Sequence, residues 1–158
     1  MKKSVIILAA ICISLLSCKS KEGMNINEDA FGFVFPKGEK TASTNFTGTV
    51  WVHMLVETDT TFNINTGNVT FEPGARTKWH YHPGGQVLLV TNGKGRYQEK
   101  GKPVIEMRKG DVIKCEPNIA HWHGAAPDSE LSHIAIGTNQ HKGAVVWLEA
   151  VKEEEYNK

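Results

Sequence analysis

The chain has 158 residues, of which 40% are hydrophobic and 22% are charged, a composition typical of one folded domain with a hydrophobic core. Its 18 basic and 17 acidic residues give a formal net charge of +1, which becomes −1 if Lys2 and Lys3 leave with a leader. This near balance excludes a strongly basic surface, so neither nucleic acid nor electrostatic binding to a membrane surface is expected.

The first 18 residues, "MKKSVIILAAICISLLSC", are predicted to be a targeting segment rather than part of the fold. Two lysines precede an apolar run over residues 5–16, which is too short for a transmembrane helix. The run ends in "LLSC", which resembles a bacterial lipobox, with cleavage before Cys18 and lipid on its thiol. The alternative is an ordinary secretory signal. The lipobox predicts an exported protein, anchored through Cys18 to a bacterial membrane and facing the periplasm.

The three cysteines predict no disulfide framework, although export exposes a protein to an oxidising compartment. Cys12 lies in the leader and Cys18 would carry the lipid, which leaves Cys115. Cys115 lies in the apolar-rich run "DVIKC" and is predicted to be a buried small hydrophobic residue rather than a nucleophile.

The rest of the chain divides into a polar tether and N-terminal arm (residues 19–43), a β-barrel (44–152) and a solvated C-terminal tail (153–158). Short runs rich in Val, Ile, Thr and aromatic residues, such as "TGTVWVHMLV" and "QVLLVTNGKGRYQ", alternate with turn residues. The segment "TNGKGRY" predicts a tight hairpin over residues 91–97. These strands predict an all-β single domain, either a β-sandwich or a small barrel.

Two His-x-His pairs are the most informative pattern in the chain. They are His80 with His82 and His121 with His123. Residues two apart in a strand share a face, so each pair presents both imidazoles to one side. The tryptophans next to the first histidine of each pair are expected to face away from that side.

A glutamine joins this pattern, because the turn at residues 83–85 reverses the chain and Gln86 opens the next strand. Its amide oxygen is then able to reach the point where His80 and His82 converge. Imidazole nitrogens bind metals at about 2.0–2.1 Å, so several ligands must meet at one point. Two pairs and a nearby amide therefore predict one divalent metal ion per chain.

Residues 74–93 read G-x5-H-x-H-x3-Q-x6-G, which resembles the first signature of the cupin superfamily, and "GDVIKCEPNIAHWHGA" resembles the second. Cupins are small antiparallel, jelly-roll-like β-barrels that usually hold a divalent metal with three histidines and a glutamate. The resemblance implies a cupin barrel with four metal ligands, His80, His82, Gln86 and His121.

Gln86 departs from this pattern, because most cupins have glutamate at its position. A neutral amide leaves the full +2 charge of the ion in place and makes the metal a stronger Lewis acid. Imidazole with an amide oxygen suits Mn(II), Fe(II), Ni(II) or Zn(II), and ligand type alone does not choose among them.

A closer resemblance covers residues 46–156, where "VTFEPGART-WH-HP-GQ", "HWHGAAP" and "SHIAI" are similar to the bacterial cupin hydroxynitrile lyases. It implies an (R)-mandelonitrile lyase activity that favours Mn(II), a small aldehyde or cyanohydrin as substrate, and a homo-oligomer, either a dimer or a tetramer. Those lyases have glutamine where Gly137 stands, so we expect a larger pocket here with one polar contact fewer.

Two further histidines are catalytic candidates. By strand parity His123 enters the same cavity as His121, where a neutral imidazole beside a metal either acts as a general base or braces the site. His133 shares a face with Ala135 and Gly137, and either lines the cavity or belongs to the core. Two other functions stay open: an Fe- or Ni-dependent dioxygenase, and a non-catalytic module that binds a metal or a sugar acid.

Overall fold

The computed structural model describes residues 34–158. The predicted leader, Cys18 and the first part of the predicted tether lie outside the described residues. The described elements, in chain order, are β1 (Glu39–Lys40), β2 (Phe46–Thr47), β3 (Val50–Val56), β4 (Ile64–Phe71), β5 (Arg76–Thr77), β6 (His80–Tyr81), β7 (Gln86–Glu99), β8 (Ile105–Arg108), β9 (Val112–Cys115), β10 (His121–Ala125), β11 (Leu131–Thr138), η2 (Gln140–Lys142), β12 (Val146–Trp147) and α1 (Glu153–Tyr156).

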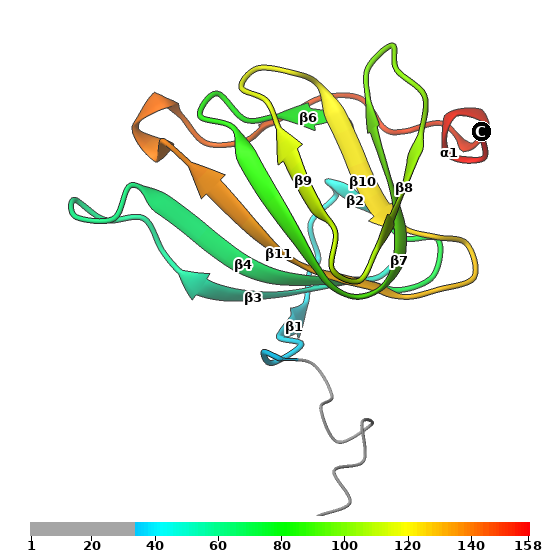
Figure 1. The fold of residues 1–158 in the computed structure, drawn as a ribbon, viewed down its shortest axis with the longest axis horizontal. Helices are drawn as coiled ribbons and strands as arrows, with labels where there is room; N and C mark the ends of the chain where they lie inside the picture. The colour runs from blue at the N-terminus through cyan, green and yellow to red at the C-terminus, as the bar shows by residue number, and fades with distance from the viewer. Residues whose placement is uncertain (1–33) are drawn as a thin grey trace, which may run out of the picture. The chain divides into compact units, whose positions relative to one another are not determined.

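The strands form one curled antiparallel sheet, in the order β1-β3-β4-β11-β7-β10-β5-β2. Strands β8 and β9 pair with β7, and β6 bridges β10 and β12. Figure 1 shows β3, β4 and β11 on one side of the curl and β10 and β8 on the other, with β7 running between them. The predicted all-β, jelly-roll-like fold is confirmed. Among residues 34–158, no helix is long and apolar enough to cross a membrane.

The predicted hairpin at residues 91–97 is wrong, because this segment lies inside the 14-residue strand β7. Asn92 and Gly93 pair with Ser132 and Leu131 of β11, and the β-bulge lies just before them at Thr91, where the register shifts between Ser132 and His133. Gly93 has φ 73°, and a Cβ on it would lie 1.8 Å from the carbonyl oxygen of Glu130. The bulge bends β7, so its first half pairs with β9 and β11 and its second half with β8 and β10.

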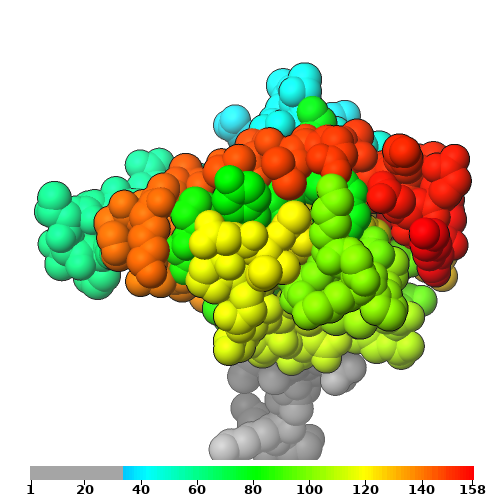
Figure 2. Space-filling view, turned by 90° about the horizontal axis from the view of Figure 1, so that it is seen from above, coloured from blue at the N-terminus to red at the C-terminus, as the bar shows by residue number. Residues whose placement is uncertain are grey.

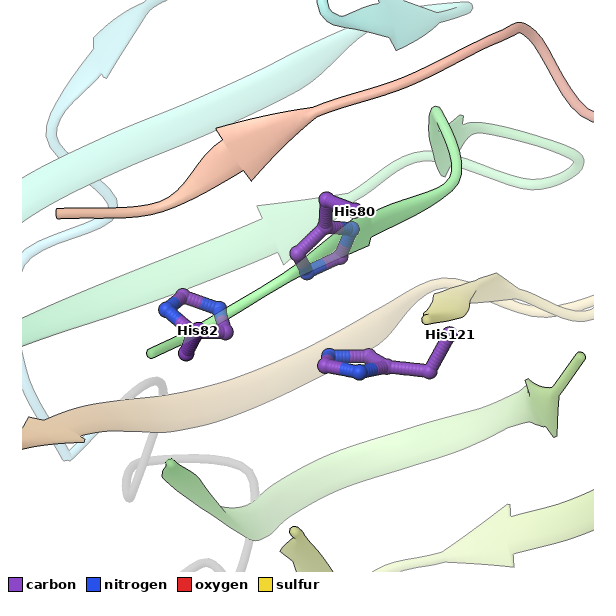
Figure 3. Close-up of side chains that lie close together, drawn as sticks. All are labelled: His80, His82 and His121. Carbon is purple, nitrogen blue, oxygen red and sulfur yellow. The ribbon is translucent and has the colours of Figure 1, made fainter. Parts of the chain in front are cut away.

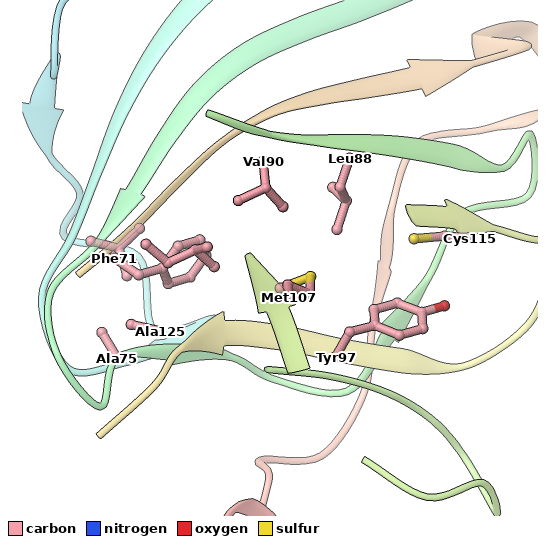
Figure 4. Close-up of a cluster of buried hydrophobic side chains, with 10 residues drawn as sticks. Phe71, Ala75, Leu88, Val90, Tyr97, Met107, Cys115 and Ala125 are labelled. Atoms are coloured by element: carbon pink, nitrogen blue, oxygen red, sulfur yellow. The ribbon is translucent and has the colours of Figure 1, made fainter. Parts of the chain in front are cut away.

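The main hydrophobic core lies inside this curl (Figure 4). Leu88, Met107 and Leu131 are completely buried, and each contributes roughly 1.5–3 kcal/mol by leaving water. Cys115 is buried among them, as predicted. Burial raises the pKa of its thiol to about 12, so the thiol is protonated at neutral pH and is a poor nucleophile.

A second cluster on the other side of the sheet contains Trp79 and Trp122, which face away from the paired histidines as predicted. They pack with Val151 and Tyr156, residues near the C-terminus. Indole Nε1 of Trp122 donates a 2.8 Å hydrogen bond to the side-chain oxygen of Gln98. The two tryptophans therefore have a structural role.

The prediction that residues 153–158 form a solvated tail is wrong for Tyr156, which is buried at the end of α1. The guanidinium groups of Arg76 and Arg96 both lie over its ring, at 4.4 and 5.0 Å from the ring centroid. Its hydroxyl donates a 2.8 Å hydrogen bond to the carbonyl oxygen of Ala125. The acidic run before Tyr156 suggested solvation, but one aromatic ring is enough to dock a short segment.

The N-terminal arm also contributes to the sheet. Strand β1 precedes the predicted start of the barrel at residue 44, and it pairs with β3 through Glu39 opposite Val52. The side-chain amide of Asn68 donates a 2.9 Å hydrogen bond to the carbonyl oxygen of Pro36. The arm therefore covers part of the outer face of β3 and β4.

Candidate metal centre

Three histidines converge inside the curl, as Figure 3 shows. His80 on β6 lies directly opposite His121 on β10, so their side chains share a face. His82 comes directly after β6, and its side chain lies on the same side as that of His80. One ring nitrogen of each histidine lies within 4.8 Å of those of the other two, a separation that one metal ion can bridge.

Backbone carbonyls set the tautomers of two of these rings. The Nδ1–H of His80 donates to the carbonyl oxygen of Lys78, and the Nδ1–H of His121 donates to that of Ile119, both at 2.9 Å. A carbonyl only accepts, so Nδ1 carries the proton and Nε2 keeps its lone pair. This is the arrangement by which proteins orient metal-binding imidazoles.

Three buried polar atoms at this point have no hydrogen-bond partner among the described residues. They are Nε2 of His82, Nε2 of His121 and the side-chain oxygen of Gln86. Leaving such atoms unsatisfied costs roughly 1–3 kcal/mol each, and a divalent cation would accept all three lone pairs. The residues therefore fit a metal held by three imidazoles and one amide oxygen.

The site favours neutral imidazoles, which metal binding requires. Burial, with a smaller contribution from His121, lowers the pKa of His80 well below its usual 6.5. The same two causes lower the pKa of His82 to about 4. Burial also lowers the pKa of His121. The rings are thus uncharged at neutral pH and their lone pairs are available.

These shifts predict that the metal-free protein loses stability between about pH 6.5 and pH 4. In this range the unfolded chain binds protons that the folded chain refuses, so the free energy of unfolding falls as pH falls. For the buried His133, whose pKa burial lowers to about 4, the loss is on the order of 3 kcal/mol. The melting temperature measured against pH tests this. His133→Gln should flatten the curve, and a curve of unchanged steepness would contradict it.

His123 and His133 form a buried pair beside the cluster. Nε2 of His133 lies 3.3 Å from Nδ1 of His123, and the ring centroids are 4.9 Å apart. Burial lowers the pKa of both, and for His123 the neighbouring His133 and His80 lower it further. The ring of His123 lies 5.3 Å from that of His80, so it faces the same interior as the cluster.

A cavity of about 160 Å³ opens beside these histidines. Its polar lining consists of Thr77, His80, His82, Gln86, His123 and His133. Its other walls are apolar and consist of Phe46, Val69, Phe71, Ala135, Val145 and Trp147. The volume equals roughly five water molecules in the liquid, which suits one small, largely apolar molecule.

Apart from Ala135, which shares a face with His133, the apolar walls were not identified from the sequence. The walls come from β2, β4, β11, β12 and the residue before β12, which are far apart in the chain, and on β4 only the alternation of Val69 and Phe71 indicated a shared inner face. Trp147 lies opposite His80 in the β6–β12 pair, with ring centroids 4.8 Å apart. The ring of Phe71 meets that of His123 edge-on, with centroids 5.7 Å apart, and that of His133 at a tilt, with centroids 5.6 Å apart.

The expectation that Gly137 enlarges the pocket and removes a polar contact is wrong. A Cβ at this position would lie 2.1 Å from the side-chain oxygen of Asn65 and 2.5 Å from the side-chain nitrogen of Gln140. Two amides therefore fill the space that a side chain at 137 would occupy. Sequence alternation along one strand cannot reveal neighbours that arrive from another strand and a loop.

Comparison with known proteins agrees with this geometry. The family model described as "Cupin domain" matches residues 67–137. An (R)-mandelonitrile lyase from Granulicella tundricola is 45% identical over 113 residues, which cover 72% of this chain and 86% of that protein.

Solved structures show the same fold. A cupin-like protein from Thermotoga maritima is 57% identical, with a TM-score of 0.76 over 80% of this chain and 96% of its own. A cupin 2 conserved barrel domain protein from Rhodopseudomonas palustris, at 15% identity, shares the fold with a TM-score of 0.56, over 74% of this chain and 76% of its own. From the extent of these likenesses, the chain belongs to the cupin family.

Proposed function

We propose that the protein is a metal-dependent carbon–carbon lyase of the hydroxynitrile lyase type, which cleaves or forms a cyanohydrin such as (R)-mandelonitrile. The observation that carries the proposal is the position of His123, a buried neutral imidazole in the same small apolar cavity as the three-histidine cluster. The likeness to the lyase from Granulicella tundricola supports it.

His80, His82, His121 and Gln86 would hold the metal, with Mn(II) favoured. The bound ion would supply Lewis acidity that makes a substrate hydroxyl easier to deprotonate. The remaining chemistry belongs to the chain's own side chains. Phe46, Phe71 and the other apolar walls would hold the substrate's ring and exclude water from the reacting carbon.

His123 would accept the hydroxyl proton of the cyanohydrin at Nε2, the ring nitrogen left free beside His133. In this state Nδ1–H of His123 donates to Nε2 of His133, which keeps the ring oriented. As the hydroxyl loses its proton, its electrons form the aldehyde C=O. The bonding pair of the C–C bond leaves with cyanide, which would take up the proton held by His123, so that hydrogen cyanide forms and His123 becomes neutral again. The reverse sequence adds cyanide to an aldehyde.

The direct test is a turnover assay of the purified protein with mandelonitrile, after loading with Mn(II), Fe(II), Ni(II) or Zn(II) in turn. Benzaldehyde release that depends on metal, without oxygen uptake, is the expected result. Oxygen consumption with a phenolic or diketone substrate would instead indicate a dioxygenase. Binding of a sugar acid without turnover would indicate a non-catalytic module.

Gln86→Glu is expected to bind metal at least as tightly as the wild type, because a carboxylate replaces a neutral amide. Its added negative charge opposes removal of the substrate's hydroxyl proton, so turnover should fall. Metal titration and the mandelonitrile assay measure the two effects separately. Gln98→Glu, on the tryptophan side of the sheet, is the matched control. An unchanged or faster rate in Gln86→Glu would show that site charge does not control the reaction.

The proposal extends to location and assembly. A lipid on Cys18 would hold the domain at a bacterial membrane on the periplasmic side, as the "LLSC" motif suggests, and the domain would assemble as a dimer or tetramer. Incorporation of labelled lipid that is lost in Cys18→Ala would support the anchor.

A further inference from the structure

A row of three residues crosses the sheet beside the metal cluster. Gly137 on β11 lies directly opposite Gln86 on β7 and, on its other side, directly opposite Asn65 on β4. Residues that are directly opposite in antiparallel strands point to the same face. Gln86 lines the cavity, so position 137 and Asn65 belong to the cavity face as well.

Gly137 has no side chain, and two amides fill its place. The Asn65 oxygen and the Gln140 nitrogen both lie within 2.5 Å of the point where a Cβ at 137 would stand. The two amide groups are therefore close to each other and to the Gln86 end of the cavity. Figure 2 shows the segment around residue 140, in orange, lying against the segment around residue 60, in teal.

The loop that carries Gln140 is held in place from both sides. The backbone N–H of Gln140 donates a 3.3 Å hydrogen bond to the backbone oxygen of Asn63, and the backbone N–H of His141 donates a 2.9 Å bond to the side-chain oxygen of the same residue. The side chain of Asn139 donates a 3.0 Å hydrogen bond to the carbonyl oxygen of Gly84, in the turn before Gln86. The backbone that carries the Gln140 amide is thus held by contacts on two sides.

The two amides retain free hydrogen-bonding capacity. In the described part of the chain, neither the side chain of Asn65 nor that of Gln140 makes a hydrogen bond, and both are partly exposed. An amide pair offers both a donor and an acceptor. By contrast, the walls that face the middle of the cavity are mostly apolar.

We propose that Asn65 and Gln140 form a polar subsite at the Gln86 end of the cavity, which selects substrates with a second hydroxyl or carbonyl group. This inference rests on the proposed function for the class of substrate, an aldehyde or its cyanohydrin. It identifies the preferred members of that class as those with a second hydrogen-bonding group.

Two probes of nearly equal shape test the subsite, 4-(hydroxymethyl)benzaldehyde and 4-ethylbenzaldehyde. Their dissociation constants are measured by calorimetry on the Mn(II)-loaded protein without cyanide, so binding is separated from turnover. In Asn65→Ala/Gln140→Ala the ratio of the two constants should shift about 3–10-fold toward the ethyl compound, the worth of one ordinary hydrogen bond.

Gly137→Ala provides a second variant, because its Cβ would displace both amides without removing them. The φ of Gly137 is not in the left-handed region and the atoms that it meets are the ends of side chains, so the fold should persist. The same shift in ratio is expected. Thr66→Ala, the neighbour of Asn65 that points to the opposite face of β4, should leave the ratio unchanged.

An unchanged ratio in the double variant, an equal shift in Thr66→Ala, or binding of neither probe would each overturn the subsite. A shifted ratio without any mandelonitrile cleavage would leave the subsite standing and refute the lyase function. Cleavage of mandelonitrile together with an unchanged ratio of dissociation constants would support the lyase function and refute the subsite.

Discussion

Replacing both His80 and His121 by alanine is expected to abolish stoichiometric metal binding and all metal-dependent activity. The two rings face each other across β6 and β10, with centroids 4.4 Å apart, and contribute two of the three clustered imidazoles. With only His82 and Gln86 left, the site has too few ligands to retain a divalent ion in competition with water. Elemental analysis after gel filtration measures the metal content per chain.

The matched control removes two histidines from outside the cluster, in His53→Ala/His141→Ala. His53 lies on β3 and His141 in η2, and neither lines the cavity. This variant should keep one metal ion per chain. One equivalent of metal in the His80→Ala/His121→Ala protein would place the metal site elsewhere.

The second large effect is expected from His123→Ala, which should keep its metal but lose turnover by roughly 10²–10⁴-fold. His123 is not among the three histidines whose ring nitrogens lie within 4.8 Å of one another, and its Nδ1 is directed at His133. That position suits a group that contacts substrate better than a fourth imidazole ligand. Metal content, melting temperature and the rate of mandelonitrile cleavage are measured on the same preparation.

The wild-type pH–rate profile provides an independent signature. Burial and the neighbouring His133 lower the pKa of His123 well below 6.5, so the base should be active through neutral pH, and the rate should fall only in acid. His121→Ala should lose metal and activity together. If His123→Ala instead turns over at the wild-type rate, His133 is the next candidate for the base. If His123→Ala loses its metal, His123 is a ligand or an essential brace.

The loss of stability in acid and the fall of the rate in acid both come from the lowered pKa of buried histidines, but the first is measured by melting temperature and the second by turnover. His133 and His82 both have a pKa of about 4 because burial disfavours their charged forms. Bound metal competes with protons for His82 but not for His133, which lies outside the metal cluster. Metal should therefore shift the pH dependence of stability only in part.

Local periodicity in the sequence determined the all-β class and which histidines share a face, and the cupin barrel with its set of metal ligands came from the resemblance of the two sequence signatures. Alternation places His80 with His82, and His121 with His123, on single faces whatever the rest of the sheet does. It also aligned Gln86, Leu88 and Val90 on the inner face of β7, where all three are buried. Burial of Cys115 followed from its apolar neighbours for the same reason.

Only the tertiary structure decided how β7 is used, how the C-terminus packs and what surrounds the cavity. The Asn-Gly pair at residues 92 and 93 is compatible with a turn, but both residues pair with β11 and continue one strand beside a bulge at Thr91. Tyr156 is buried because Arg76 and Arg96, from strands far away in the chain, pack their guanidinium groups against its ring. These are contacts between distant segments, and periodicity along one strand contains no information about them.

The same reason explains the space beside Gly137. A glycine in a sequence reads as a missing side chain, and the expected consequence is a larger pocket. In the folded chain, Asn65 on β4 and Gln140 on η2 occupy that space, because the cross-strand register and the anchored loop direct both amides to it. The sequence determined which side chains share a face, and the packing of distant segments determined what fills the space between them.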